Sequence, residues 1–380
     1  MGRLSYTRSK AVLSGLGSGL ALLLVSPLAR AEYGLNLQPP VTPIARIIFD
    51  LHTLILVICV IIFVIVFSVM FYAVFAHRKS RGHKAAKFYE NSRLEVVWTV
   101  IPFLILVGMA IPSTATLIEM DDLSGSEMTV KITGYQWKWQ YEYLDHDLGF
   151  FSVLATPREQ INNDAPKGEH YLLEVDKPLV LPTRKKIRLL VTANDVIHAW
   201  WVPQFGSKKD AIPGFINEIW TRIEKPGTYR GQCAELCGTD HGFMPVVVEA
   251  VSEREFSSWV KEQKAMMVAA AADADRTFQK KELMERGKET YGKICVQCHG
   301  PTGQGVPGVF PPIAGSKVAT GPVGQHVDTV MNGKPGTAMQ AFANQLNDVD
   351  IAAVVTYQRN AFGNNAGDVV QPSQVKALRK

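Results

Sequence analysis

The 380-residue chain has few cysteines and, outside two local clusters, no excess of basic residues. Five cysteines are too few for a disulfide framework. Residues 1–31 carry four basic and no acidic residues, and residues 77–95 carry six basic and two acidic ones, so the rest of the +5 chain sums to −3. This distribution argues against nucleic-acid binding. A hydrophobic content of 47% with 20% charged residues excludes a disordered chain, and no internal repeat is visible.

Charged residues are also missing from three stretches near the N-terminus. The apolar run 11–28 follows basic residues and precedes the A-x-A pattern at 29–31, which predicts a signal peptide over 1–31, with a retained membrane anchor as the alternative. Residues 53–76 and 96–118 contain no charge, and each is long enough to cross a ~30 Å hydrocarbon layer as a helix. These runs predict a transmembrane hairpin.

The hairpin is expected to occupy residues 32–119, with helices at about 50–76 and 95–118. The basic residues between the two helices place their connection in the cytoplasm by the positive-inside rule. Both ends of this multi-pass segment then face outward, and the residues after 119 lie in an oxidising compartment.

The residues beyond the membrane fall into four segments. Residues 120–251 contain short alternating or β-branched runs separated by turn residues, which predicts an all-β domain, either an antiparallel sandwich or a barrel. Residues 252–282 are charged and alanine-rich, which indicates a helical linker. Residues 283–363 are expected to form an all-α domain, and residues 364–380 a tail.

Four soft or imidazole side chains lie within twelve residues of the β segment: Cys233, Cys237, His241 and Met244. A further histidine, His198, lies 35 residues earlier. Thiolates and imidazoles combined with a thioether are typical of copper in electron transfer, and two cysteines can bridge two copper ions. The alternatives are a disulfide between the two cysteines and a zinc site, for which methionine is a poor ligand.

Residues 44–251 resemble subunit II of the haem–copper cytochrome c oxidases. The strings that carry the resemblance are 134–143 (GYQWKWQYEY), 195–201 (DVIHAWW), 209–214 (KDAIPG) and the 233–244 loop. The resemblance implies a cupredoxin fold with a dinuclear copper centre, CuA. It implies these ligands: the side chains of His198, Cys233, Cys237, His241 and Met244, and the backbone carbonyl of Glu235. The Glu235 side chain would help to hold a magnesium ion at the contact with subunit I.

Two further roles follow from the same resemblance. Trp137 matches the tryptophan at which electrons enter the family's copper domain, although an aromatic residue in a strand is more often part of the core. Glu95 matches the carboxylate at which protons enter the K-pathway from the cytoplasm, although a carboxylate at a helix end is usually a solvated one. We expect Trp139, Tyr141 and Tyr143 to be packing residues.

The motif Cys295-x-x-Cys298-His299 is the attachment signature of a c-type haem, with His299 as the proximal iron ligand. Met331 and Met339 compete for the second axial position. Residues 283–363 resemble a class I cytochrome c domain, in which the methionine follows an Asn-Gly-Lys turn, and this favours Met339. Gln340 stands where many such domains have proline. His326 is expected at the surface.

A copper domain and a haem domain on one membrane-anchored chain resemble subunit II of the caa3-type oxidases. The resemblance implies electron flow from a cytochrome or quinol:cytochrome c reductase donor to the haem, then to CuA and to subunit I, which reduces oxygen to water with proton pumping. This chain alone has no oxygen-reducing site. Subunit III is a further expected partner, and the location is the bacterial cytoplasmic membrane, with both domains on the periplasmic side. The alternatives are an electron-input subunit of a nitric oxide or nitrous oxide reductase, and a non-enzymatic membrane-anchored electron carrier.

Overall fold

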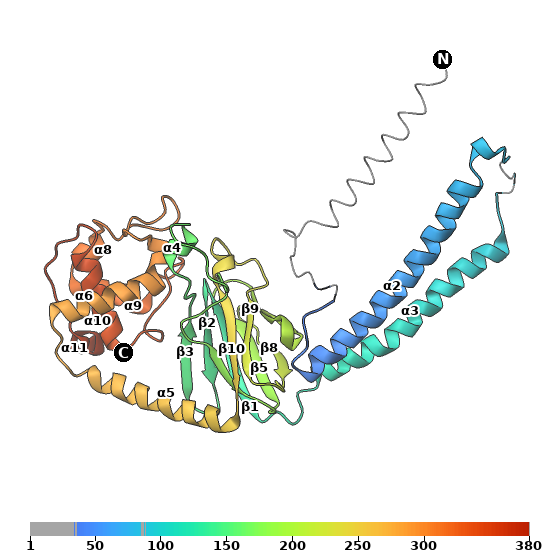
Figure 1. Ribbon diagram of the computed structural model, residues 1–380. Helices are drawn as coiled ribbons and strands as arrows, with labels where there is room; N and C mark the ends of the chain where they lie inside the picture. Colours follow the sequence, from blue (N-terminus) through green and yellow to red (C-terminus); the bar gives the residue numbers. More distant parts are fainter. Residues whose placement is uncertain (1–33, 35, 85–86, 88, 380) are drawn as a thin grey trace, which may run out of the picture. The chain divides into compact units, whose positions relative to one another are not determined.

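The computed structural model describes residues 34, 36–84, 87 and 89–379 (Figure 1). The expected signal peptide, 1–31, lies outside these residues. The chain divides into two compact units, residues 1–38 and 39–380, and the fold described below is that of the second unit.

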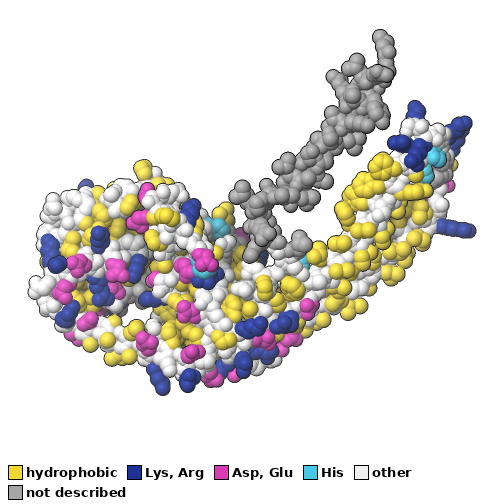
Figure 2. Space-filling model, viewed as in Figure 1, with side chains coloured by type: hydrophobic (Ala, Val, Ile, Leu, Met, Phe, Trp, Pro, Cys, Tyr) yellow, Lys and Arg dark blue, Asp and Glu magenta, His cyan; other side chains and the backbone are white. Residues whose placement is uncertain are grey.

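Two long apolar helices, α2 (Pro43–Ala76) and α3 (Ser92–Asp121), open this unit and are joined through the short 3₁₀ turn η1 (Lys79–Arg81). Both are long and apolar enough to cross a membrane. Figure 2 shows hydrophobic side chains along both helices and basic side chains at the end where they are joined. The predicted pair of apolar helices is confirmed.

The two helices begin earlier than the hydrophobic pattern predicted because their caps lie upstream of the apolar runs. The Thr42 hydroxyl accepts a hydrogen bond from the amide of Ala45, at 3.0 Å, and starts α2. The Asn91 side chain accepts one from the amide of Leu94, at 3.1 Å, and starts α3. Each cap satisfies a backbone N–H that has no partner within the helix.

The β domain consists of three sheets, with strand orders β3-β2-β1-β5-β8, β4-β10-β9 and β6-β7. The predicted all-β domain is confirmed, but it is not purely antiparallel, because β1 pairs in parallel with β5 and β4 with β10. Each of these pairs joins strands far apart in the sequence, so no hairpin imposes an antiparallel direction. The strands are β1 (Met128–Tyr135), β2 (Lys138–Tyr143), β3 (Leu148–Ser152), β4 (Leu179–Pro182), β5 (Ile187–Ala193), β6 (His198–Val202), β7 (Ser207–Ala211), β8 (Asn217–Thr221), β9 (Gly227–Gln232) and β10 (Pro245–Val251).

Helix α5 (Glu253–Asp273) follows β10 directly and occupies the segment predicted to be a helical linker. A capping box between Ser252 and Glu255 starts it. Phe256 and Val260, on its first two turns, belong to the buried core of the β domain. The beginning of α5 is therefore part of that domain.

The C-terminal domain is helical, as predicted. Its main packing contact is between α6 and α10, and a Cβ at Gly287 would collide with the backbone carbonyl of Ala353, so glycine permits this close approach. Its elements are α6 (Lys280–Thr290), the π-helical turn η4 (Tyr291–Cys295), α7 (Val296–His299), α8 (Lys317–Thr320), α9 (Val323–Asn332), α10 (Asp348–Asn360) and α11 (Pro372–Leu378).

Two expectations for this domain differ from the structure. The residues after 363 do not form a separate tail, because Val370 and Val375 are buried in the same core as α9 and α10. His326 is not a surface residue: it is 3% exposed, and its Nε2 lies 2.8 Å from Gln358 Oε1. It lies on the buried face of α9 together with Val327 and Val330.

Candidate copper and haem sites

The loop 233–244 is held at both ends by paired strands. β9 ends at Gln232 and β10 begins at Pro245, and these two residues face each other in the antiparallel register. The amide of Cys233 donates to the carbonyl of Met244, at 3.2 Å, and continues the pairing into the loop. The amide of Ala234 donates to the carbonyl of Ala199 on β6, at 3.0 Å, which brings the loop to the strand that begins at His198.

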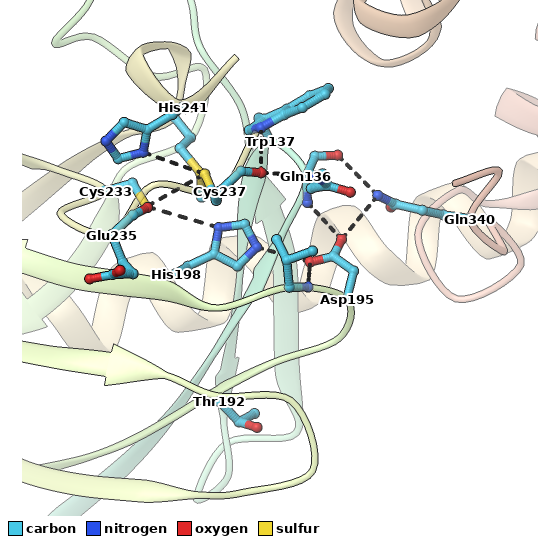
Figure 3. Close-up of polar contacts among 12 residues, drawn as sticks. Gln136, Trp137, Thr192, Asp195, His198, Cys233, Glu235, Cys237, His241 and Gln340 are labelled. Atoms are coloured by element: carbon cyan, nitrogen blue, oxygen red, sulfur yellow. Dashed lines mark hydrogen bonds and ion pairs between the residues drawn. The ribbon is translucent and has the colours of Figure 1, made fainter. Parts of the chain in front are cut away.

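The six groups expected to bind copper lie in one cluster (Figure 3). The ligand atoms of His198, Cys233 and Cys237 all lie within 4.8 Å of one another. The two Sγ atoms are 3.9 Å apart, and both cysteines are free thiols, so the structure contains no disulfide here. The remaining distances are 3.9 Å from Cys233 Sγ to His198 Nδ1, 3.4 Å from Cys233 Sγ to the Glu235 carbonyl oxygen, 3.5 Å from Cys237 Sγ to His241 Nδ1, and 3.5 Å from Cys237 Sγ to Met244 Sδ.

This donor set fits a pair of soft metal ions. Two thiols at the centre have an imidazole each, and a thioether and a carbonyl complete the cluster. Such a set suits copper, whereas structural zinc takes four cysteine or histidine ligands. Cys233, Cys237 and Met244 are almost fully buried, so the cluster is shielded from solvent.

The two thiols differ in acidity because they share a hydrogen bond. The hydrogen bond from Cys237 lowers the pKa of Cys233 far below that of an ordinary thiol, and the same contact, with burial, raises the pKa of Cys237. Burial would lower the pKa of His198, but hydrogen bonds to Asp195 and Cys233 raise it above its usual value.

The ring of His198 lies against the backbone of β1. A Cβ at Gly134 would lie 2.7 Å from His198 Cδ2, so only glycine leaves room for the imidazole at this position. On the other side, Asp195 Oδ1 lies 2.9 Å from His198 Nε2. The sequence contains a signal for this second contact, because Asp195 is a carboxylate three residues before a candidate ligand. Asp195 is nevertheless not among the site residues predicted from the sequence.

Trp137 is 3% exposed and contacts the ligand loop directly. Its Nε1 donates to the carbonyl of Cys237, at 3.2 Å, and Gln136 Nε2 donates to the same carbonyl, at 2.9 Å (Figure 3). The three aromatic residues expected to be packing residues are buried in the core of the β domain: Trp139, Tyr141 and Tyr143.

The haem-attachment motif lies at the end of η4 and along α7. The Nδ1–H of His299 donates to the carbonyl of Pro311, at 2.9 Å, which leaves Nε2 as the ring nitrogen available to an iron. A backbone partner on the distal nitrogen is the usual way in which a metal-binding histidine is oriented. Two free thiols and an imidazole are the groups that a covalently attached haem requires, and Cys295 packs against the same core cluster as Met339.

The two candidate axial methionines lie in different surroundings. Met331 is 2% exposed and lies on α9, within the core of the helical domain. Met339 lies in the loop between α9 and α10, is partly buried, and packs against that core from outside.

Glu95 and the Glu235 side chain are exposed and belong to neither cluster. Glu95 lies in the first turn of α3, where its Oε1 accepts a hydrogen bond from the amide of Asn91, at 3.2 Å. This contact satisfies a free backbone N–H at the helix N-terminus.

Three family models match the chain. Residues 128–251 match "Cytochrome C oxidase subunit II, periplasmic domain", residues 30–116 match "Cytochrome C oxidase subunit II, transmembrane domain", and residues 282–357 match "Cytochrome C oxidase, cbb3-type, subunit III".

The alignments with similar proteins cover most of the length of each relative. It is 40% identical over 227 residues to a probable cytochrome c oxidase subunit 2 of Rickettsia bellii, covering 60% of this chain and 82% of the relative. It is 35% identical over 280 residues to the cytochrome c oxidase subunit 2 of Cereibacter sphaeroides, covering 67% and 92%. The crystal structure of the periplasmic domain of subunit II of the Bradyrhizobium japonicum cytochrome oxidase is 43% identical, with a TM-score of 0.35, over 38% of this chain and 99% of that one.

Proposed function

The chain belongs to the cytochrome c oxidase subunit II family, and we propose that it is an electron-input subunit that carries its own haem. Electrons from an external donor would arrive at a covalently bound haem c, pass to a dinuclear CuA centre, and continue to subunit I for the reduction of oxygen to water with proton pumping. The observation that carries this proposal is the single cluster formed by His198, two thiols, His241, Met244 and a backbone carbonyl, next to a tryptophan.

The chain's own residues supply the copper site in this proposal. Cys233, Cys237, His198 and His241 would hold the two ions, with Met244 and the Glu235 carbonyl as weaker ligands. A bound dicopper centre supplies one-electron transfer shared over two ions. The paired strands β9 and β10 hold the loop at both ends, which supports a site whose ligand positions would change little between oxidation states.

The haem site would use Cys295 and Cys298 for thioether bonds and His299 and Met339 as axial ligands. Methionine as the second axial ligand raises the reduction potential of a c-type haem, which suits the acceptance of electrons from a respiratory donor. The hydrogen bond from His299 to Pro311 supports this assignment, because it orients the imidazole ring.

Three further assignments belong to the same proposal. Trp137 would be the residue at which electrons enter the copper domain, which its hydrogen bond to Cys237 supports. The exposed Glu235 side chain would share a magnesium ion with subunit I. Glu95, in the first turn of α3 at its proposed cytoplasmic end, would be the residue at which protons enter.

The proposed setting is the bacterial cytoplasmic membrane, with the β and helical domains on the periplasmic side. Subunit I is the partner that the family implies, and subunit III and a cytochrome or quinol:cytochrome c reductase donor complete the proposed chain of partners. The basic residues between α2 and α3 support the cytoplasmic placement of that connection.

The test is to purify the tagged full chain from membranes and to measure oxygen uptake, the haem spectrum and the copper content together. We expect two copper ions and one haem per chain, a haem that acid acetone does not extract, and co-purifying oxidase activity. The Cys233→Ser variant should lose the mixed-valence copper signal and keep the haem band. Cys59 is an exposed thiol on α2, so Cys59→Ser is the matched control and should keep both the copper signal and the haem band.

One copper ion per chain, or an extractable haem, would contradict the site assignments. Consumption of nitric or nitrous oxide in place of oxygen would instead identify the chain as the electron-input subunit of a nitric oxide or nitrous oxide reductase. Loaded metal and haem without any co-purifying partner would leave a free-standing electron carrier.

A further inference from the structure

Gln340 follows Met339 directly, yet its side chain forms hydrogen bonds with the β domain and not with its own loop (Figure 3). Its Nε2 donates to the backbone carbonyl of Gln136, at 2.9 Å, and lies 3.5 Å from Asp195 Oδ2. An amide nitrogen has two hydrogens, so both acceptors can be served at once. Its Oε1 is buried without a partner among the described residues, so all hydrogen bonds found for this side chain cross to the β domain.

Both acceptors of Gln340 are connected to the copper cluster. Asp195 Oδ1 lies 2.9 Å from Nε2 of His198, and Asp195 Oδ2 accepts from the amide of Gln136, at 2.8 Å. The Gln136 side chain in turn donates to the carbonyl of Cys237, at 2.9 Å. One amide thus contacts the groups that orient His198 and Cys237, one residue away from the candidate axial methionine.

A second contact from the same loop supports this arrangement. The ring of Phe342 lies 4.8 Å from Nζ of Lys138, which is 5% exposed and follows Trp137. Cys298 and Phe310 of the helical domain also pack against the core of the β domain. The haem-attachment segment and the Met339 loop therefore meet the β domain around the turn between β1 and β2.

We propose that Gln340 is a positioning residue that docks the haem-carrying loop on the Gln136–Trp137 turn and on Asp195, for electron transfer to the copper site. The inference rests on the proposed function and adds the residue that sets the relative placement of donor and acceptor. Its chemistry is that of a donor facing two acceptors. A carboxylate at position 340 would be repelled by both, an apolar chain would bind neither, and an ammonium would bind both.

The experiment uses the full chain in the assembled enzyme, with four variants: Gln340→Glu, Gln340→Met, Gln340→Lys and Gln345→Glu. Gln345 is the matched control because it lies in the same loop, but its side chain donates to Ala341 within that loop. Haem-to-copper transfer is measured after photoreduction of the haem, together with the haem spectrum and the reduction potentials of both centres. Hydrogen exchange of peptides covering 136–143 and 336–346 is the readout that does not depend on turnover.

We expect Gln340→Glu to slow haem-to-copper transfer roughly tenfold, because a hydrogen bond to a charged group is lost and repulsion replaces it. Exchange of both peptides should rise, while the haem spectrum and both potentials stay at wild-type values. Gln340→Met should lie between Gln340→Glu and the wild type, and Gln340→Lys should restore transfer and protection. Gln345→Glu should leave the transfer rate and the 136–143 peptide unchanged.

Wild-type transfer and wild-type protection in both Gln340→Glu and Gln340→Met would overturn the role of Gln340, as would an equal effect of Gln345→Glu. The role of Gln340 would also be overturned if the haem spectrum changed in Gln340→Glu and Gln340→Met and stayed changed in Gln340→Lys. The residue would then act on the iron ligand alone. If the wild-type enzyme itself shows no haem-to-copper transfer, the proposed function fails.

Discussion

Asp195 Oδ1 lies 2.9 Å from His198 Nε2, while the other ring nitrogen, His198 Nδ1, faces Cys233 Sγ at 3.9 Å. Both nitrogens of this buried imidazole are therefore committed, one to a carboxylate and the other to the thiol cluster. A carboxylate in this position fixes the ring orientation and raises the basicity of the ligand nitrogen. In the proposed copper site, the strength of His198 as a ligand would accordingly depend on Asp195.

Replacing Asp195 with asparagine should weaken copper binding without affecting the haem. The amide keeps the shape but removes the charge that supports His198, and loss of such an outer-shell partner costs roughly 10–100-fold in metal affinity. Copper retention against a chelator series measures this effect. Asp164→Asn, at an exposed carboxylate, should retain copper like the wild type, and equal retention in Asp195→Asn would show that the carboxylate does not support the ligand.

Haem-to-copper transfer within the chain should depend little on ionic strength. Residues 119–282 sum to −5, whereas residues 283–363 sum to only +1, so charge attraction between the two domains is weak. The contacts found between them include hydrogen bonds from the neutral Gln340 amide to a backbone carbonyl and to the Asp195 carboxylate, a lysine on an aromatic ring, and apolar packing, and none of these is an ion pair. Exposed charges are screened beyond ~8 Å at physiological salt, and tethering supplies a millimolar-range effective concentration.

The measurement is the transfer rate at low and at high salt after photoreduction of the haem. Reduction of the same enzyme by an added soluble cytochrome, a bimolecular encounter, is the comparison. A steep fall of the intramolecular rate with salt, as for electrostatically steered association, would contradict the expectation.

The clustering of the candidate copper ligands could be predicted from the sequence where these residues lie close together in it. Cys233, Cys237, His241 and Met244 share one loop, and with His198 they indicated a soft metal site from residue type and spacing, whereas the Glu235 carbonyl came from the resemblance alone. Gln340 could not be predicted as a contact, because it is separated by 204 residues from Gln136 and by 145 from Asp195. Such positions come together only through the packing of two domains, and no periodic pattern in the sequence indicates which residues will form that contact.

Strand direction and the extent of the helical domain were harder to predict for the same reason. The parallel pairing of β1 with β5 depends on tertiary packing of strands that alternate just as antiparallel ones do. His326 was predicted wrongly because one polar residue on a short helix was considered alone. Considered with Val327 and Val330, it falls on the buried face.

The stability of the helical domain should fall between about pH 7 and about pH 4 because of His326. Burial lowers the pKa of His326 to about 4, and Arg359 opposes its charge further, whereas Gln358 favours it. The unfolded chain, with a histidine pKa near 6.5, binds the proton first. The contribution of neutral His326 to the free energy of unfolding is therefore fully present above about pH 6.5. It is lost as the pH falls through the folded-state pKa, and the total loss is about 3 kcal/mol.

Denaturant unfolding followed at the haem band, at several pH values, measures this loss. His326→Gln keeps an amide donor for Gln358 and removes the titration, so its stability should vary less over the same range. His83→Gln, at an exposed histidine, should follow the wild-type curve. Parallel curves for the wild type and His326→Gln would show that another group controls the acid sensitivity.

Glu95→Gln should slow oxygen reduction severalfold while the copper content, the haem content and haem-to-copper transfer stay normal. A group that delivers protons must load from water and release inward, and a carboxylate near the aqueous boundary of a membrane helix can do both. In the structure Glu95 Oε1 also accepts a hydrogen bond from the amide of Asn91, at 3.2 Å, and a glutamine oxygen can accept the same bond. The substitution therefore preserves the cap and removes only the titrating proton. Glu90→Gln, an exposed acid in the preceding connection, should turn over like the wild type. If assembled Glu95→Gln enzyme matches the wild-type rate across roughly pH 6–9, Glu95 serves only to cap α3, and protons enter elsewhere.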